Sequence, residues 1–153
     1  MAIEVTLETT IERPAEAVFE RVADVETWPE WLIASGITAV RRSSTGPLAL
    51  GERLVVDQLA AGRPATFAAE VAVLAPPSRL AIRGRDDDGV SIDIEASLAS
   101  VLEATATTLR WTIRIGLPLR FRIFEGIARP QVGRAVALDL EALRRRLEST
   151  ASD

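Results

Sequence analysis

Apolar and polar residues alternate along the first segment of the chain. From Ile3 to Ile11 the odd positions carry apolar residues or threonine, while the even positions carry only Glu or Thr. A period of two sends alternate side chains to opposite faces of an extended strand, so one face is dry and the other is wet. The pattern therefore predicts a half-buried β-strand over residues 3–11.

Helical spacing replaces this alternation at Pro14, a residue that favours the first turn of a helix. From there to Asp24, apolar residues recur every three or four positions, which predicts a short helix with one buried face. A second short helix is predicted over residues 25–33. We expect Gly36 to end it, because glycine readily adopts the left-handed conformation that follows helix C-termini.

The central part of the chain consists of apolar runs separated by turn residues. No helical pattern lies between these runs, and parallel strands need a long crossover that is usually a helix. We therefore expect a meander of antiparallel hairpins. The predicted strands cover residues 37–42, 52–59, 63–74, 78–83, 90–103 and 107–117.

A long amphipathic helix is predicted over residues 127–148, because its apolar positions recur at helical spacing. Pro130 lies early in this segment and implies either a kink or a later start of the helix. The predicted apolar stripe consists of Val132, Val136, Leu140, Leu143 and Leu147.

Five residue types are missing from the composition: Cys, His, Tyr, Lys and Asn. Their absence excludes thiol chemistry, imidazole acid/base catalysis, Schiff bases and His- or Cys-ligated metals. We attribute it to a compositional bias towards Arg, Ala and Leu. Proton transfer by a side chain would have to use Asp or Glu. We expect no cofactor and no metal site.

The charge distribution gives no sign of a nucleic-acid partner. The net charge is −4 and the pI is about 5.0, whereas nucleic-acid binding needs a basic surface. No signal peptide and no apolar run long enough to span a bilayer is evident, so we expect no membrane insertion and a cytoplasmic protein. The acidic run 86–88 lacks the ligands of a calcium loop and is predicted to be a solvated hairpin tip.

Three stretches of the sequence resemble the START-like (SRPBCC) superfamily of polyketide cyclases and lipid-transfer proteins. They are ETTIERPAEAVFERVADVETWPEW near the start, LEATATTLRWTIRI in the last predicted strands, and ALDLEALRRRLE in the final helix. The resemblance spans nearly the whole chain, so we expect one START-like domain over residues 1–153. It implies the α+β helix-grip fold, in which a curved seven-stranded antiparallel sheet, with two short helices after its first strand, encloses a cavity against the long C-terminal helix.

Strand alternation combined with this fold gives a set of candidate ligand-binding residues. Phe121 and Phe124 lie where a gate over the cavity is expected, just before the last helix. Gly133 is a costly residue in a helix interior, which suggests that it leaves room for a ligand. The full set is Gln58, Val56, Phe67, Val71, Trp111, Ile113, Phe121, Phe124, Gly133, Trp31 and Arg41.

Several of these candidates have a structural alternative. Gln58 either faces the cavity or lies at a strand end in solvent, and Arg41 either points inward or keeps its charge at the rim. Trp31 either forms part of a cavity wall with Trp28 or plugs the core. Trp111 either stacks on a planar ligand or fills core volume. A catalytic residue is not identified, and Glu125 is the one carboxylate near the expected gate.

The function predicted from these observations is binding of a small hydrophobic molecule, polyketide- or lipid-like, between the sheet and the C-terminal helix. An alternative is a polyketide cyclase, aromatase or dehydratase, in which the pocket shapes a reactive chain. A further alternative is a protein-interaction module without a small ligand. Association into a homodimer remains open.

Overall fold

Seven antiparallel strands form one sheet in the computed structural model, which describes residues 2–151. The order across the sheet is β1-β7-β6-β5-β4-β3-β2, so every strand after β1 pairs with its neighbour in sequence, and β1 closes against β7. The predicted strands and the α+β helix-grip fold are confirmed. The strands are β1 (Ala2–Ile11), β2 (Ile37–Arg42), β3 (Arg53–Ala60), β4 (Arg63–Ala75), β5 (Arg79–Arg85), β6 (Ser91–Val101) and β7 (Ala106–Gly116).

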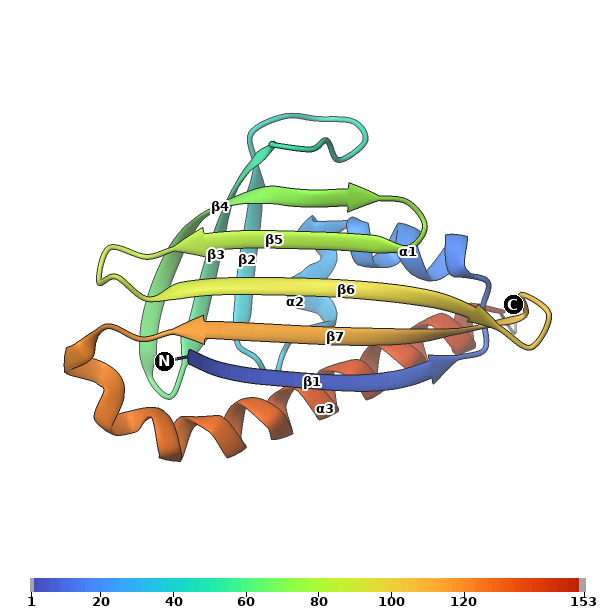
Figure 1. Ribbon diagram of the computed structural model, residues 1–153. Helices are drawn as coiled ribbons and strands as arrows, with labels where there is room; N and C mark the ends of the chain where they lie inside the picture. Colours follow the sequence, from blue (N-terminus) through green and yellow to red (C-terminus); the bar gives the residue numbers. More distant parts are fainter. Residues whose placement is uncertain (1, 152–153) are drawn as a thin grey trace.

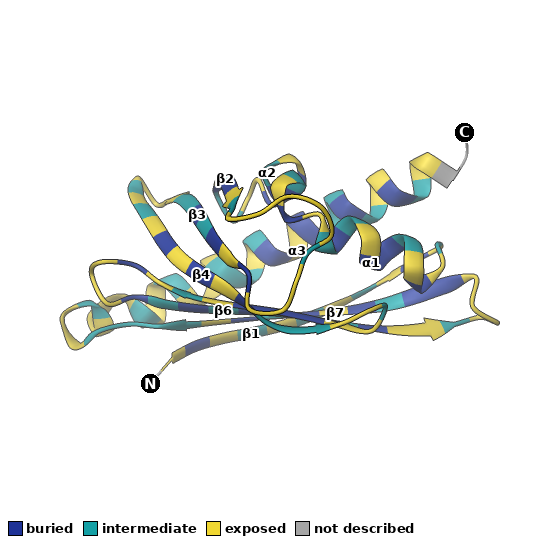
Figure 2. Ribbon diagram, turned by 90° about the horizontal axis from the view of Figure 1, so that it is seen from above, coloured by how far each residue is buried: buried dark blue, intermediate teal, exposed yellow. Residues whose placement is uncertain are grey.

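The helices all lie on the concave side of this sheet (Figure 1). Strands β1, β5, β6 and β7 form a long floor, and β2, β3 and β4 turn up from it on the side where α3 runs (Figure 2). The two expected short helices follow β1, and a 3₁₀ turn precedes the long one. The helical segments are α1 (Ala15–Ala23), η1 (Val25–Thr27), α2 (Trp28–Trp31), η2 (Leu119–Phe124) and α3 (Glu125–Ala151).

The long helix α3 begins at Glu125 and includes Pro130, so the proline does not delay the start of the helix. Proline is tolerated there because it lies near the N-terminal end, where few intrahelical hydrogen bonds are lost. The predicted apolar stripe faces the core, with Val136, Leu140 and Leu143 fully buried. It is this stripe that fixes α3 against the floor of the sheet.

Two β-bulges change the faces expected from strict alternation. In β2 the register shifts between Ile37 and Ala39, and in β4 it shifts between Val71 and Val73. One extra residue in a strand sends every later side chain to the opposite face. Beyond the β4 bulge, Leu74 rather than Val73 therefore packs against the core.

The β2 bulge determines the position of Arg41. Its guanidinium is exposed and donates to the carboxylate of Asp57, with 2.6 Å between Nη1 and Oδ2. The same contact lowers the pKa of Asp57 below its ordinary value, since the hydrogen bond and the positive charge favour the carboxylate. Arg41 thus lies on the outer face of the sheet and does not point inward.

Candidate functional site

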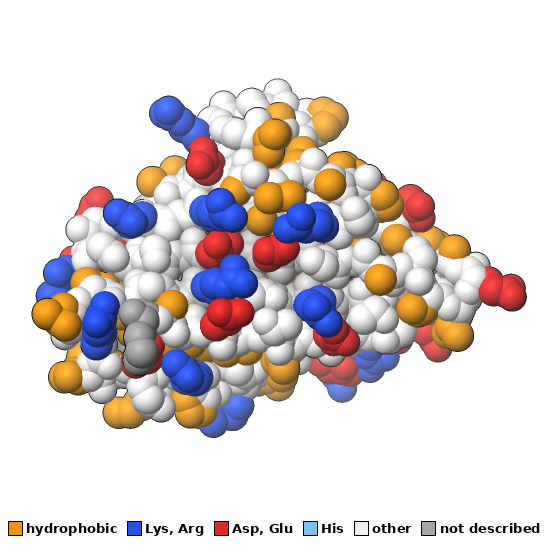
Figure 3. All heavy atoms as spheres, in the orientation of Figure 1, with side chains coloured by type: hydrophobic (Ala, Val, Ile, Leu, Met, Phe, Trp, Pro, Cys, Tyr) orange, Lys and Arg blue, Asp and Glu red, His pale blue; other side chains and the backbone are white. Residues whose placement is uncertain are grey.

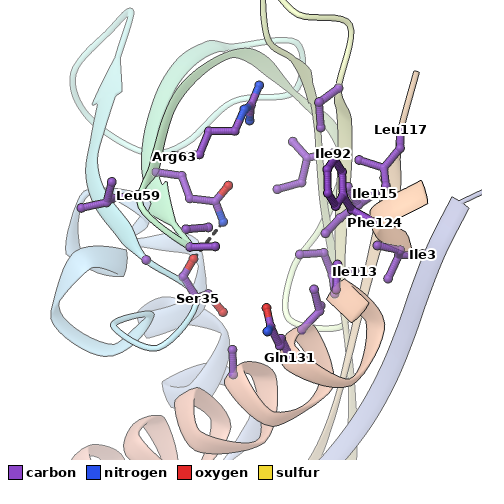
Figure 4. Close-up of a pocket in the computed structure, with 18 of the residues that line it drawn as sticks. Ile3, Ser35, Leu59, Arg63, Ile92, Ile113, Ile115, Leu117, Phe124 and Gln131 are labelled. Atoms are coloured by element: carbon purple, nitrogen blue, oxygen red, sulfur yellow. Dashed lines mark hydrogen bonds between the residues drawn. The ribbon is translucent and has the colours of Figure 1, made fainter. Parts of the chain in front are cut away.

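A cavity of about 690 Å³ lies between the curved sheet and the N-terminal half of α3. Its floor is apolar and comes from β1, β6 and β7, and Ile3, Ile92, Ile113 and Ile115 face it from one side (Figure 4). Phe121 and Phe124 of η2 line one end, and α3 supplies the remaining apolar wall. The other apolar lining residues are Ile33, Ala34, Leu59, Ala60, Ala61, Phe67, Val90, Leu117, Ile127, Ala128, Val132 and Ala135.

The few polar groups of the cavity lie opposite this floor. Figure 4 shows Ser35 and Arg63 on the wall that faces the isoleucines, with Gln131 projecting from α3. Gln58 is partly buried in the same wall, and its Nε2 donates to the Ser35 carbonyl at 2.8 Å. Its Oε1 has no hydrogen-bond partner among residues 2–151. Gln58 therefore lies in the cavity wall with an acceptor left for a bound molecule.

A buried carboxylate holds the segment that carries Ser35. Asp139 of α3 is only 2% exposed, and its two oxygens accept the backbone N–H groups of Ala34 and Ser35, each at 2.8 Å. Burial raises the pKa of Asp139 above its ordinary value, and the two N–H donors oppose that rise. Asp139 thereby holds the loop between α2 and β2 against helix α3.

Sequence reasoning missed Asp139, although a signal was present. The residue stands three positions after Val136 and four before Leu143, so it belongs to the apolar stripe of α3. A single carboxylate inside such a stripe is buried and needs hydrogen-bond donors from a neighbouring element. Its acidic neighbour Glu141, by contrast, pairs with Arg144 and Arg145 on the helix surface.

The same loop approaches the β3–β4 hairpin very closely at Gly36. This residue has φ +79°, and a Cβ there would come within 2.0 Å of the Leu59 carbonyl oxygen. The Leu59 N–H also donates to the Gly36 carbonyl at 2.8 Å. Only glycine satisfies both the left-handed backbone and this contact, which sets the edge of the cavity near Leu59.

An ionic cluster surrounds the ring of Phe121 at the mouth of the cavity. Arg63 donates to Asp86 at 3.0 Å and to Asp88 at 2.6 Å, and its guanidinium lies 5.4 Å from the Phe121 ring centre. Arg120 lies 4.9 Å from the same ring centre and donates to the Asp88 carbonyl. Through these contacts the β3–β4 hairpin, the β5–β6 hairpin and η2 are joined around one aromatic side chain.

The acidic run 86–88 is therefore only partly a solvated tip. Asp87 and Asp88 are exposed, but Asp86 is buried and accepts the backbone N–H groups of Asp88 and Val90 at 3.0 and 2.9 Å. These bonds fix the turn, and the remaining Asp86 oxygen is left for Arg63. Within residues 2–151, no group of three or more acidic side chains is arranged to hold a metal ion.

Comparison with known proteins identifies the family. The family described as polyketide cyclase / dehydrase and lipid transport matches residues 2–148, nearly the whole chain. The chain belongs to this family. No curated protein matches it significantly. No helix within the described residues is long and apolar enough to span a membrane.

Solved structures similar to this START-like domain confirm the fold. A START superfamily protein from Mycobacterium smegmatis has 17% sequence identity and a TM-score of 0.74, covering 96% of this chain and 98% of its own. The aromatase/cyclase Zhui from Streptomyces sp. R1128 has 19% identity and a TM-score of 0.77, covering 97% of this chain and 94% of its own. Identity at this level shows a common fold.

The START-like domain brings some of the sequence-predicted site residues together. Gln58, Phe67, Ile113, Phe121 and Phe124 line the cavity. Gly133 is half-buried beside open space but lies outside the lining, and Arg41 is on the outer face. The remaining candidates, which are Val56, Val71, Trp31 and Trp111, lie in the packed core.

The three core tryptophans pack against one another outside the cavity lining. Trp28 and Trp31 meet the ring of Trp111 edge to face, with centre distances of 5.8 and 5.3 Å. Trp28 Nε1 donates to the Val22 carbonyl at 2.8 Å. All three rings are fully buried, and none lies in the cavity wall, so they act as a plug rather than a lid.

Proposed function

We propose that the domain binds a small hydrophobic molecule, polyketide- or lipid-like, in the cavity between sheet and α3. The observation that carries the proposal is a cavity of about 690 Å³ whose lining is mostly aliphatic and aromatic. Small-molecule sites commonly measure about 300–1,000 Å³ and combine apolar walls with a few polar groups. Burial of apolar ligand surface would supply most of the affinity.

The two-sided lining supports an amphipathic ligand. Its apolar part would lie on the isoleucine floor of β6 and β7, and its oxygen atoms would face Gln58 and Arg63. Arg63 already pairs with Asp86 and Asp88, so it would contribute hydrogen bonds rather than a full unbalanced charge. A neutral carbonyl or hydroxyl therefore fits this wall better than a strongly anionic group.

Two alanines of α3 offer a matched test. Ala135 lines the cavity, whereas Ala137 is exposed on the same helix. We expect Ala135→Phe to fill part of the cavity and weaken binding of the fluorescent probe N-phenyl-1-naphthylamine at least tenfold, while Ala137→Phe leaves binding unchanged. Equal binding by both variants, or no saturable binding by the wild type, would overturn the proposal. Native mass spectrometry would show whether a small molecule that co-purifies with the wild type is absent from Ala135→Phe.

A second candidate function is cyclisation or dehydration of a polyketide chain. It is favoured by the polar groups of the lining, which are Ser35, Gln58 and Arg63 on one wall and Gln131 on α3. Among the lining residues that the structure describes, Arg63 is the only charged one, so the cavity would act mainly by folding the chain and orienting its carbonyls. Family membership and the fold shared with an aromatase/cyclase are consistent with this candidate.

Turnover of a poly-β-ketone thioester separates the two functions. If the domain is an enzyme, Gln58→Leu and Arg63→Gln should lower kcat, and Arg41→Gln on the outer face should not. If it is a carrier, none of the variants changes the uncatalysed product distribution. We propose in addition that residues 1–153 work as one domain in the cytoplasm, a compartment with which the absence of cysteine is compatible.

A further inference from the structure

Large exposed apolar side chains gather around the mouth of the cavity. Nine such residues occur among those described, and six of them belong to the three segments that border the mouth. The segments are the loop after α2, the β3–β4 hairpin and the stretch from η2 into α3. The six residues are Ile33, Leu59, Leu119, Ile123, Phe124 and Ile127.

This mouth surface, defined by those six residues, is continuous with the cavity. Ile33, Leu59, Phe124 and Ile127 are exposed and also line the cavity, so a hydrophobic molecule passing in or out would touch them. Leu119 and Ile123 are 78% and 79% exposed and lie outside the lining. Their exposure serves neither the core nor the ligand, which calls for a contact outside the chain.

Positive charge accompanies the apolar side chains. Residues 119–134 contain four arginines and one glutamate, in a chain whose net charge is −4. Arg122 and Arg134 are exposed and make no ion pair within the described residues, and Arg129 pairs only with Glu125 at 3.8 Å. At the lower left of Figure 3, where η2 and the first turns of α3 lie, arginine and hydrophobic side chains stand side by side.

The acidic hairpin tip lies on the same side and limits this charge. Two of its three carboxylates, Asp86 and Asp88, are already paired with Arg63. Arg120 also approaches Asp88, at 3.8 Å. Attraction to an anionic surface is therefore modest, and apolar insertion has to supply most of any binding free energy.

We propose that the mouth surface docks peripherally on an anionic lipid bilayer, so that the cavity opens towards the acyl region. Apolar side chains interleaved with arginine suit the boundary between headgroups and acyl chains. A bilayer also provides an apolar phase continuous with the cavity, whereas a protein bound over the same residues would cover the opening. The inference rests on the proposed ligand binding, because a docked mouth has a purpose only if a molecule passes through it.

Two pairs of strongly exposed residues provide the test. The variant Leu119→Ser/Ile123→Ser removes apolar groups from the mouth surface without touching the cavity lining. The control Leu102→Ser/Leu138→Ser changes residues that are 70% and 65% exposed elsewhere. Flotation with vesicles of phosphatidylcholine and phosphatidylglycerol, and with phosphatidylcholine alone, measures partitioning of the intact chain.

We expect the wild type and the control to float with the anionic vesicles, and to bind the neutral vesicles more weakly. The mouth variant should lose about tenfold or more in partitioning, the size expected when two large side chains no longer insert. Wild-type levels of binding by the mouth variant would overturn the proposal. Equal binding to both vesicle types would overturn the anionic assignment.

Two further measurements separate this inference from neighbouring ones. Binding of N-phenyl-1-naphthylamine in solution should be the same for the mouth variant and the wild type, because the cavity lining is unchanged. If the wild type does not bind the probe, the proposed ligand binding is wrong, whatever the vesicle experiment shows. Gel filtration of the lipid-free chain tests a second copy as the occupant. A dimer that the mouth variant dissociates, together with no vesicle binding, would replace the bilayer by a homodimer interface.

Discussion

Asp139 and Ser35 are joined by a hydrogen bond of 2.8 Å between the carboxylate and the Ser35 backbone N–H, although they stand 104 positions apart in the chain. The Ser35 carbonyl in turn accepts the amide of Gln58 in the cavity wall. The buried carboxylate of Asp139 on α3 is thus connected through two hydrogen bonds to Gln58, a polar group that faces the cavity. The loop between α2 and β2 is the link, so its position depends on Asp139.

Replacement of Asp139 by alanine should destabilise the domain strongly. The N–H groups of Ala34 and Ser35 would lose their acceptors, at a cost of about 2–5 kcal/mol in the free energy of unfolding. Urea denaturation measures this cost. Glu141→Ala removes a carboxylate from the surface of the same helix and should change the unfolding free energy much less. Equal effects of the two variants would contradict the anchoring role of Asp139.

The buried carboxyl should also make stability depend on pH in a defined direction. Burial raises the pKa of Asp139 above 3.8, so the native state holds this proton more tightly than the unfolded state. Its contribution to stability is full below pH 3.8 and is lost as the pH rises through the window up to the raised pKa. The unfolding free energy of the wild type minus that of Asp139→Asn should therefore decrease from acid towards neutral pH. An increase of this signed difference over the same range would show a lowered pKa instead.

The sequence pattern predicted well which face of the sheet a residue occupies. It predicted poorly whether that residue lies in the packed core or in the cavity wall. On β7, Trp111 and Ile113 share one face, yet Trp111 lies in the packed core and Ile113 in the cavity wall. The same division separates Val56 from Gln58 on β3. Alternation reports which side of the sheet a residue occupies. Where the core ends and the cavity begins is set by α3 and the tryptophans, which are distant in sequence.

Two other features depended on partners that a local pattern does not reveal. The bulge in β2, which sends Arg41 outward, has no distinct turn residue at its position, since Thr38 is an ordinary strand former. Arg63 looked like the start of a strand, and its contact with Phe121 joins segments more than fifty residues apart. The apolar helix stripe and the antiparallel meander needed only local periodicity, and the helix-grip fold followed from the family resemblance, so these could be predicted.

Neutralising Asp88 should speed ligand exchange. Asp88 binds Arg63 and approaches Arg120, and both guanidinium groups lie close to the Phe121 ring, so Asp88→Asn loosens the contacts that hold the mouth together. We expect the dissociation rate of N-phenyl-1-naphthylamine to rise about two- to fivefold, as suits an exposed ion pair. Stopped-flow fluorescence measures the rate.

Asp87→Asn is the matched control for this change, because the neighbouring Asp87 is exposed and makes no ion pair within the described chain. The two variants should differ less at high salt, which screens exposed charges. If both variants release the probe at the wild-type rate at low salt, the ionic cluster does not restrain the mouth.

Gly36 provides the sharpest test of the cavity edge. In Gly36→Ala the new Cβ would meet the Leu59 carbonyl oxygen at 2.0 Å in a backbone with φ +79°, and the hydrogen bond between the two residues prevents easy separation. We expect a loss of about 2–4 kcal/mol in the unfolding free energy and weaker probe binding, because the β3–β4 hairpin must shift.

Gly46→Ala is the control that isolates the contact from the backbone conformation. Gly46 has φ +83°, but no atom lies within 4 Å of the position that a Cβ would take, so only the left-handed backbone is penalised, by about 1 kcal/mol. Probe binding should be unaffected, since Gly46 lies in the loop between β2 and β3, away from the cavity lining. Chemical denaturation and probe titration of both variants give the comparison. Similar losses of stability, with probe binding intact in both, would mean that the Gly36 contact with Leu59 does not shape the cavity.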